Sequence, residues 1–382
     1  MRAVRRSRAQ AAGPGFALSD GAAVSLVTVA PGGDVYNRFG HTGVRVFDPA
    51  SGLDVLYNYG TFRFDGLFVF RFAYGALDYE LSVQEYPRAV AFYRDVEGRT
   101  TVEQRLDLDA RQRQALFEAL ETNARPENAT YRYDFLFDNC STRPRDVLER
   151  VLGPALRYRP AAYRPATFRA ILAPYVRPAP LLHTGIDLAL GLPVDRRATQ
   201  RETTFLPDYL FALLNRAEVQ TPGGWRPLVA RVDTVVYAPA RRAAFPWPGW
   251  ALAALFAAGA GMTLRDVVRR RPSRHVWMDR ALFGAAGLAG CVLAFLWLVS
   301  LHDVTGPNLH VLWAWPTHLA FAFVLRRRTR AVRRYALAAA VVSGATALAW
   351  FALPQALPVA VLPLVLLLAV RALALWWRGE AA

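Results

Sequence analysis

The sequence contains no lysine, so all 46 of its basic residues are arginine, and the formal net charge is +16. A nucleic-acid-binding protein is expected to present such a charge as a patch beside base-stacking aromatic side chains. Here much of the arginine lies in short segments between long apolar runs. This distribution argues against a nucleic-acid partner and is typical of the loops of an integral membrane protein.

Cysteine is also scarce, with only Cys140 and Cys291 among 382 residues. Cys291 lies midway along an apolar run, whereas Cys140 lies in a polar segment, so no disulfide is expected between them. A lone thiol outside the cytoplasm tends to oxidise or pair unless it has a chemical role. One polar-segment cysteine and two histidines in unrelated contexts lack the ligand spacing of a zinc site. We therefore expect neither a metal nor another cofactor.

Long apolar runs are absent from residues 1–245 but dominate residues 246–382. A helix of about 20 apolar residues crosses the hydrocarbon core of a bilayer. Buried helices of a soluble protein explain one such run but not several. The sequence predicts an all-α transmembrane bundle of about five helices, at about 248–264, 281–301, 308–325, 335–352 and 356–377.

The arginines between these runs orient the predicted bundle. Residues 265–280 and 326–334 each carry six arginines, whereas residues 302–307 carry none. By the positive-inside rule the two arginine-rich loops are cytoplasmic. The first span then enters from the other side, which makes residues 22–245 an extracytoplasmic domain. Residues 1–21 are interpreted as a remnant export segment or a disordered tail.

Residue patterns predict an α+β fold for the extracytoplasmic domain. Helical periodicity predicts a helix over 109–124 with Asp109 as N-cap, and another over 141–152 that ends at Gly153. Residues 67–79 fit either a strand or a short helix. Alternating apolar and polar residues predict several strands, and helical periodicity predicts one further helical segment. The strands are expected at 22–30, 41–48, 53–60 and 99–108, the helical piece at 203–217 and the late strand at 225–238.

Cys140, His41 and Asn58 are the candidate catalytic residues. A cysteine at the start of a helix meets unpaired N–H groups and the positive end of the helix dipole, which favour the thiolate. A histidine can take the thiol proton and later protonate a leaving group. His41 starts a predicted strand, and His183 is the alternative base. Asn58, one predicted strand further on, orients His41 if the two strands pair, or else caps a turn.

Three segments that carry these residues, FGHTGVRV, YNYGTFRFD and YDFLFDNCSTRPRD, together resemble the DUF4105 family, the Lnb N-terminal periplasmic domain family. Residues 191–210 and 308–318 look like later parts of the same proteins. The resemblance implies a papain-like thiol domain, similar to a circularly permuted NlpC/P60 fold with His before Cys. It implies Cys140 as nucleophile, His41 as base and Asn58 as the third residue.

Founding members of that family act as bacterial lipoprotein N-acyltransferases. The resemblance implies an inner-membrane enzyme that moves a fatty acyl chain from phospholipid, through a Cys140 thioester, to the N-terminal amine of a lipoprotein. Arg143 and Arg145 are then expected to hold the donor phosphate, or else to form a solvated helix face. Tyr57 and Asn139 are assigned to substrate binding, and His302 to substrate entry or a helix cap.

Two other functions fit the same residues. One is a membrane-tethered cysteine peptidase or amidase that acts on cell-wall peptide, which has no need of five spans. The other is a non-enzymatic membrane protein with a decayed Cys–His pair, which the intact polar context of Cys140 disfavours.

Overall fold

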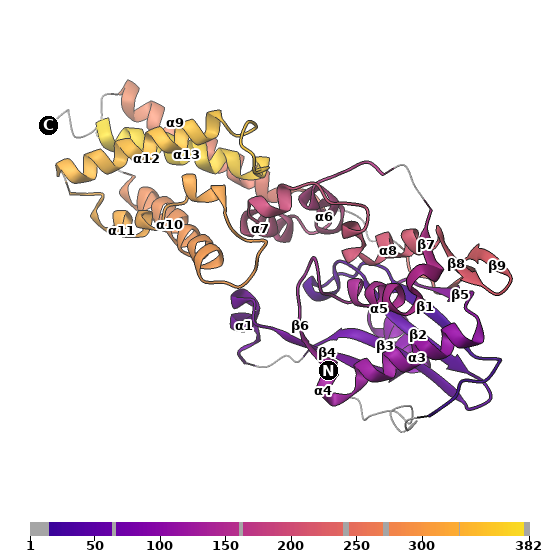
Figure 1. Ribbon diagram of the computed structural model, residues 1–382. Coiled ribbons are helices and arrows are strands. Elements are labelled where there is room, and N and C mark those ends of the chain that lie inside the picture. The colour runs from indigo at the N-terminus through magenta and orange to yellow at the C-terminus, as the bar shows by residue number, and fades with distance from the viewer. Residues whose placement is uncertain are drawn as a thin grey trace. The chain divides into compact units, whose positions relative to one another are not determined.

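The computed structural model describes residues 15–62, 66–159, 163–239, 244–269, 275–327 and 329–377. The predicted tail at residues 1–21 lies outside the described residues as far as residue 14. The chain divides into two compact units. The first comprises Met1–Phe72, Ala76–Ala166 and Ala198–Arg241, and the second Ala73–Gly75, Thr167–Arg197 and Arg242–Ala382 (Figure 1). Residues 167–197, assigned from sequence to the extracytoplasmic domain, thus group with the second unit.

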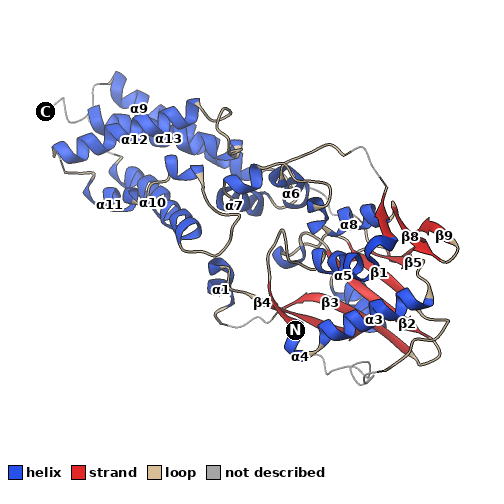
Figure 2. Cartoon of the chain, in the orientation of Figure 1, coloured by secondary structure: helices blue, strands red, loops and turns tan. Residues whose placement is uncertain are grey.

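An antiparallel seven-stranded sheet forms the centre of the first unit, in the order β10-β5-β1-β2-β3-β4-β6 (Figure 2). The predicted strands at 22–30, 41–48, 53–60 and 99–108 are confirmed. The ambiguous segment 67–79 forms a short helix and then enters β4. The sheet consists of β1 (Ala23–Val29), β2 (His41–Asp48), β3 (Leu53–Thr61), β4 (Asp78–Glu85), β5 (Thr101–Leu106), β6 (Thr130–Arg132) and β10 (Val229–Val236).

Helices α3 (Ala110–Ala124) and α5 (Thr142–Leu152) pack their apolar sides against the sheet. Both were predicted, and their ends follow local signals. The Asp109 carboxylate accepts from Gln112 N at 2.8 Å, and the Gln112 side chain accepts from Asp109 N at 3.1 Å, which caps α3. α5 ends at Gly153, whose φ is +49°. The buried core here includes Leu116, Phe117, Leu120, Val147 and Leu148 with Val24, Val46 and Tyr57.

The remaining elements of the first unit differ more from the predictions. The predicted helix 203–217 is a 3₁₀ turn followed by the shorter α8. The predicted strand 225–238 is two strands in different sheets, divided around Pro227, which lacks the N–H of a strand donor. These elements are α1 (Phe68–Tyr74), α2 (Tyr86–Ala91), α4 (Pro126–Ala129), α8 (Pro207–Leu214), and the small sheet of β7 (Leu156–Tyr158), β8 (Ala217–Thr221) and β9 (Gly224–Pro227).

The second unit is helical, and among the described residues three of its helices are long and apolar enough to cross a membrane, at Trp247–Val268, Val276–Leu298 and Val359–Trp377. The expectation of about five spans is met in part. The segment 308–325 is a 3₁₀ turn and the eight-residue α11, because Pro316 interrupts the helix. The helices are α6 (Phe168–Val176), α7 (Pro180–Ala189), α9 (Trp247–Val268), α10 (Val276–Leu298), α11 (Thr317–Val324), α12 (Arg330–Leu348) and α13 (Leu362–Trp377).

The fourth predicted span, 335–352, overlaps α12. The first turns of α12 carry three arginines, and these lower the mean hydropathy of the helix. Parts of both arginine-rich loops, residues 270–274 and 328, lie outside the described residues.

A buried ion pair joins three helices of the second unit. Arg371 of α13 donates to both carboxylate oxygens of Asp279 in α10, at 2.7 and 3.0 Å. Its third nitrogen donates to the Thr263 hydroxyl of α9 at 2.7 Å. Both charged side chains are 0% exposed. Charges within a membrane domain are costly unless paired, so this contact fixes the packing of α9, α10 and α13.

Candidate active site

His41 and Asn58 meet at one end of the central sheet. β2 and β3 pair antiparallel, which is the condition under which Asn58 was expected to orient His41, with Val44 opposite Tyr57. This register brings the His41 Nε2 to 2.6 Å from the Asn58 Oδ1. A carboxamide oxygen only accepts hydrogen bonds, so Nε2 carries the imidazole proton. The Nδ1 atom of His41 therefore has the lone pair that can accept a proton.

Cys140 lies beside the first residues of β2, immediately before α5. The backbone N–H groups of Thr42 and of Cys140 itself act on its sulfur and lower the pKa of the thiol. Thr42 directly follows His41 in the strand, so the structure brings the cysteine and the histidine to the same place. Gly60 of β3 packs directly against Cys140, because a Cβ atom at Gly60 would lie 3.4 Å from the Cys140 Cβ. Its φ of +94° also favours glycine.

Asn139 builds the turn that presents Cys140. Its side-chain oxygen accepts from the N–H groups of Ser141 and Thr142 at 2.8 and 3.0 Å. Its amide nitrogen donates to the carbonyls of Phe135 and Phe205 at 2.7 and 2.9 Å. The residue is 2% exposed. These bonds occupy the side chain, so the predicted role of Asn139 in substrate binding does not fit, and its geometry serves to shape the loop.

Burial controls the charge state of the site. It raises the pKa of the Cys140 thiol to about 11, although the Thr42 N–H and the Arg99 guanidinium lower it. In the resting site burial therefore outweighs the stabilisation of the thiolate that the helix N-terminus was expected to give. Burial, helped by Arg99, lowers the pKa of His41 to about 4, while Asn58 and Glu97 act in the opposite direction. At neutral pH the site holds a thiol and a neutral imidazole.

Aromatic side chains surround the thiol. Tyr79 and Tyr133 stack with ring centroids 4.2 Å apart, and Phe62 lies 5.2 Å from Tyr79. Phe62 also contacts Tyr36 at 6.5 Å, and Tyr36 is 56% exposed. Burial raises the pKa of Tyr79 to about 12, and the nearby Cys140 adds to that rise. The surroundings of the sulfur are thus aromatic and extend to an exposed tyrosine.

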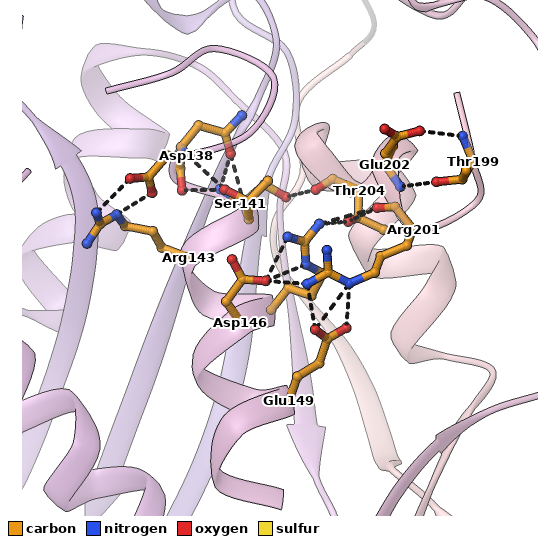
Figure 3. Close-up of polar contacts among 12 residues, drawn as sticks. Asp138, Ser141, Arg143, Asp146, Glu149, Thr199, Arg201, Glu202 and Thr204 are labelled. Atoms are coloured by element: carbon orange, nitrogen blue, oxygen red, sulfur yellow. Dashed lines mark hydrogen bonds and ion pairs between the residues drawn. The ribbon is translucent and has the colours of Figure 1, made fainter. Parts of the chain in front are cut away.

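The two arginines after the cysteine pair with residues of the protein itself, and Figure 3 shows the pairing of Arg143 with Asp138. Arg143 donates to both Asp138 oxygens at 2.6 and 2.7 Å, and its guanidinium lies 3.5 Å from the Tyr131 ring centroid. Arg145, 4% exposed, donates to Asp146 and to the Thr204 hydroxyl, each at 2.7 Å. Their predicted role as phosphate ligands does not fit these pairings, which instead hold the first turn of α5.

Of three further predicted residues, Tyr57 belongs to the core of the first unit, and His183 and His302 belong to the second unit. Tyr57 is 0% exposed and its hydroxyl donates to Glu121, which makes it a core residue rather than a substrate contact. His183, the alternative base, lies in α7 with its Nε2 3.1 Å from Asp187. His302 belongs to the same unit, where its backbone N–H donates to the Ser300 hydroxyl at 3.3 Å.

Sequence reasoning did not identify Arg99, a buried cation next to the site. It is one of 46 arginines, and its loop carries no motif. Within the described ranges, no group of three or more His, Cys, Asp or Glu side chains is arranged to hold a metal ion.

A folded α+β unit and a helical unit with candidate spans define a multi-pass membrane protein with a domain outside the bilayer. The model of the Lnb N-terminal periplasmic domain matches residues 17–173, and that of the Lnb transmembrane domain matches residues 241–379. Together the two matches cover most of the chain, which belongs to the Lnb family. No curated protein and no solved structure matches it. Membership indicates a membrane enzyme whose N-terminal domain is periplasmic.

Proposed function

We propose that this chain is a thiol acyltransferase of the bacterial inner membrane, with a papain-like, permuted NlpC/P60-like domain in the periplasm. It moves a fatty acyl chain from phospholipid to the N-terminal amine of a lipoprotein. The observation that carries the proposal is the position of Cys140 beside the start of β2: the Thr42 N–H lowers the pKa of the thiol, and the preceding His41 is held by Asn58 at 2.6 Å.

In the first half-reaction the Cys140 sulfur attacks the ester carbonyl of the phospholipid. The thiol proton passes to Nδ1 of His41 as the sulfur–carbon bond forms. The ester carbon–oxygen bond then breaks, and the leaving lysophospholipid takes the proton from His41. The Thr42 and Cys140 N–H groups, which lower the pKa of the thiol, stabilise negative charge that develops on the sulfur.

In the second half-reaction the lipoprotein amine attacks the thioester carbonyl. A nitrogen–carbon bond forms, His41 accepts a proton from the amine, and the sulfur–carbon bond breaks. The proton returns to the sulfur, which restores the thiol and the neutral imidazole. Asn58 keeps the imidazole in the tautomer that both halves require, because its oxygen holds the proton on Nε2.

The apolar surroundings of the thiol favour a lipid substrate over a cell-wall peptide. Val35 and Tyr36, on the loop before His41, are 60% and 56% exposed, and Phe137, three residues before Cys140, is 46% exposed. Exposed apolar side chains near a partly buried nucleophile suit the binding of acyl chains. A peptide carrying several charges has no matching polar lining among these residues.

Intact-protein mass spectrometry tests the proposal. The purified full-length protein is incubated with phospholipid and compared with Cys140→Ser and, as a matched control, Cys291→Ser. We expect a hydroxylamine-labile increase of one acyl chain in the wild type and in Cys291→Ser, but not in Cys140→Ser. A folded wild type that gains no acyl chain, but cleaves cell-wall peptide, would favour the peptidase or amidase instead.

A further inference from the structure

Arg99 is held rigidly at the end of the sheet where the candidate active site lies. Its Nε donates to the Ala30 carbonyl at 2.6 Å, and its Nη2 lies 3.5 Å from the Val29 carbonyl. Val29 is the last residue of β1 and pairs with His41. The guanidinium therefore lies against the strand end that opposes the histidine. Its side chain is only 3% exposed.

Glu97 links this arginine to the loop that leads to His41. One Glu97 oxygen accepts from Arg99 Nη1 at 2.6 Å, and the other accepts from Asn37 Nδ2 at 3.0 Å. The Asn37 side chain also accepts from Asp34 N at 3.0 Å, and its carbonyl accepts from Gly40 N at 3.2 Å. A continuous set of bonds thus runs from the guanidinium to the residue before His41.

The charge of Arg99 also acts on both reacting groups. Burial is the larger influence, raising the pKa of Cys140 and lowering that of His41, and Arg99 lowers the pKa of both. Glu97 is the other charged group acting on His41 and opposes Arg99 there. The other titratable groups near the sulfur are the phenols of Tyr79, Tyr93, Tyr131 and Tyr133, which are uncharged at neutral pH.

We propose that Arg99 is a positioning residue of the Cys140–His41 site, which fixes the His41 loop through Glu97 and Asn37 and offsets the negative charge that forms on the sulfur. This inference deepens the proposed acyl transfer but does not depend on which acyl donor is used. A thiolate in a buried site gains stability from a nearby fixed cation, because little solvent screens their attraction.

The test measures the rate of Cys140 alkylation by iodoacetamide against pH, in full-length protein carrying Cys291→Ser. The double variant Arg99→Gln/Glu97→Gln removes the cation without leaving a buried unpaired carboxylate. We expect alkylation about tenfold slower than in the parent at each pH below the thiol pKa. Arg99→Lys keeps the charge and should stay within about threefold of the parent. Arg105→Gln changes an exposed arginine of β5, the strand that follows Arg99, and its alkylation rate should equal that of the parent.

Glu97→Gln gives an independent result of opposite sign. Removing this carboxylate leaves the Arg99 charge uncompensated, so alkylation should become a few-fold faster while acyl transfer slows through the loosened loop. If the double variant fails to fold, Glu97→Gln decides the question alone. An unchanged or slower alkylation in Glu97→Gln, or an unchanged rate in a folded double variant, would overturn the inference. Because alkylation needs no lipid, failure of acyl transfer in the wild type leaves this test intact.

Discussion

Replacing Gly40 with alanine should disable the site through the backbone. Gly40 has φ +84°, and a Cβ there would lie 3.0 Å from the Val29 carbonyl oxygen and 3.3 Å from Pro207. A non-glycine residue in the left-handed region costs about 1–2 kcal/mol. The Val29 carbonyl belongs to β1, so the added methyl group must displace the backbone that leads directly into His41.

The chain offers a matched control in Gly52→Ala. Gly52 has φ +72°, and a Cβ there meets nothing within 4 Å. Both variants should lose about 1–2 kcal/mol of unfolding free energy from the backbone conformation alone. Only Gly40→Ala should also slow catalysis, because a displacement of about 1 Å at a catalytic group can cost about a hundredfold in rate.

The assay is the rate of thioester formation on phospholipid, measured by mass beside a thermal melt of each variant. We expect a loss of about ten- to a hundredfold in Gly40→Ala and less than about twofold in Gly52→Ala. Equal acylation rates in the two variants, with similar melting temperatures, would refute the claim that the Gly40 turn sets the position of His41.

Three further measurements test the chemistry and the packing. Thioester formation should fall as the pH drops through about 4, where His41 becomes protonated, and Asn58→Asp should move this fall to higher pH because a carboxylate favours the imidazolium. In a Cys291→Ser background, the alkylation rate of Cys140 should rise about tenfold per pH unit up to about 11, whereas a plateau below pH 8 would contradict a neutral resting thiol. Arg371→Met should lower the unfolding free energy of the detergent-solubilised protein by about 3–5 kcal/mol, measured by thermal or denaturant unfolding, because it leaves the Asp279 charge buried and unpaired. The double variant Arg371→Met/Asp279→Leu removes both charges and should lose less.

The parts of the site that local patterns control could be predicted from the sequence. Alternating residues predicted β2 and β3 as successive strands, and Asn58 was expected to orient His41 if the two strands paired, which they do. The helix-start pattern after Cys140 likewise corresponds to α5. Both predictions rest on spacings of a few residues, where the periodicity of strands and the chemistry of helix ends dominate.

The electrostatics of the site depend instead on contacts between distant segments. Arg99 binds carbonyls of Val29 and Ala30, about 70 positions earlier in the chain. Arg145 is buried only because residues near Thr204 cover it. No local pattern reveals such burial, so sequence reasoning assigned Arg145 to a ligand and did not identify Arg99. The sign of the thiol pKa shift was missed for the same reason, since desolvation depends on tertiary packing.

A neutral resting pair is physically suited to transfer rather than hydrolysis. The partial burial that raises the pKa of Cys140 also limits the access of water to the sulfur, and water is the nucleophile that would hydrolyse a thioester. The amine acceptor must then arrive unprotonated, and His41, with a pKa near 4, is in the form that receives its proton as attack proceeds.

A variant that opens the aromatic surroundings of the thiol, such as Tyr79→Ala, should therefore raise the ratio of fatty acid released to amine acylated. Because Tyr79 is 8% exposed and stacks on Tyr133, Tyr79→Phe provides the control that keeps the packing and removes only the hydroxyl. If the ratio of released fatty acid to acylated amine is unchanged in Tyr79→Ala, the burial of Cys140 does not determine whether an amine or water attacks the thioester.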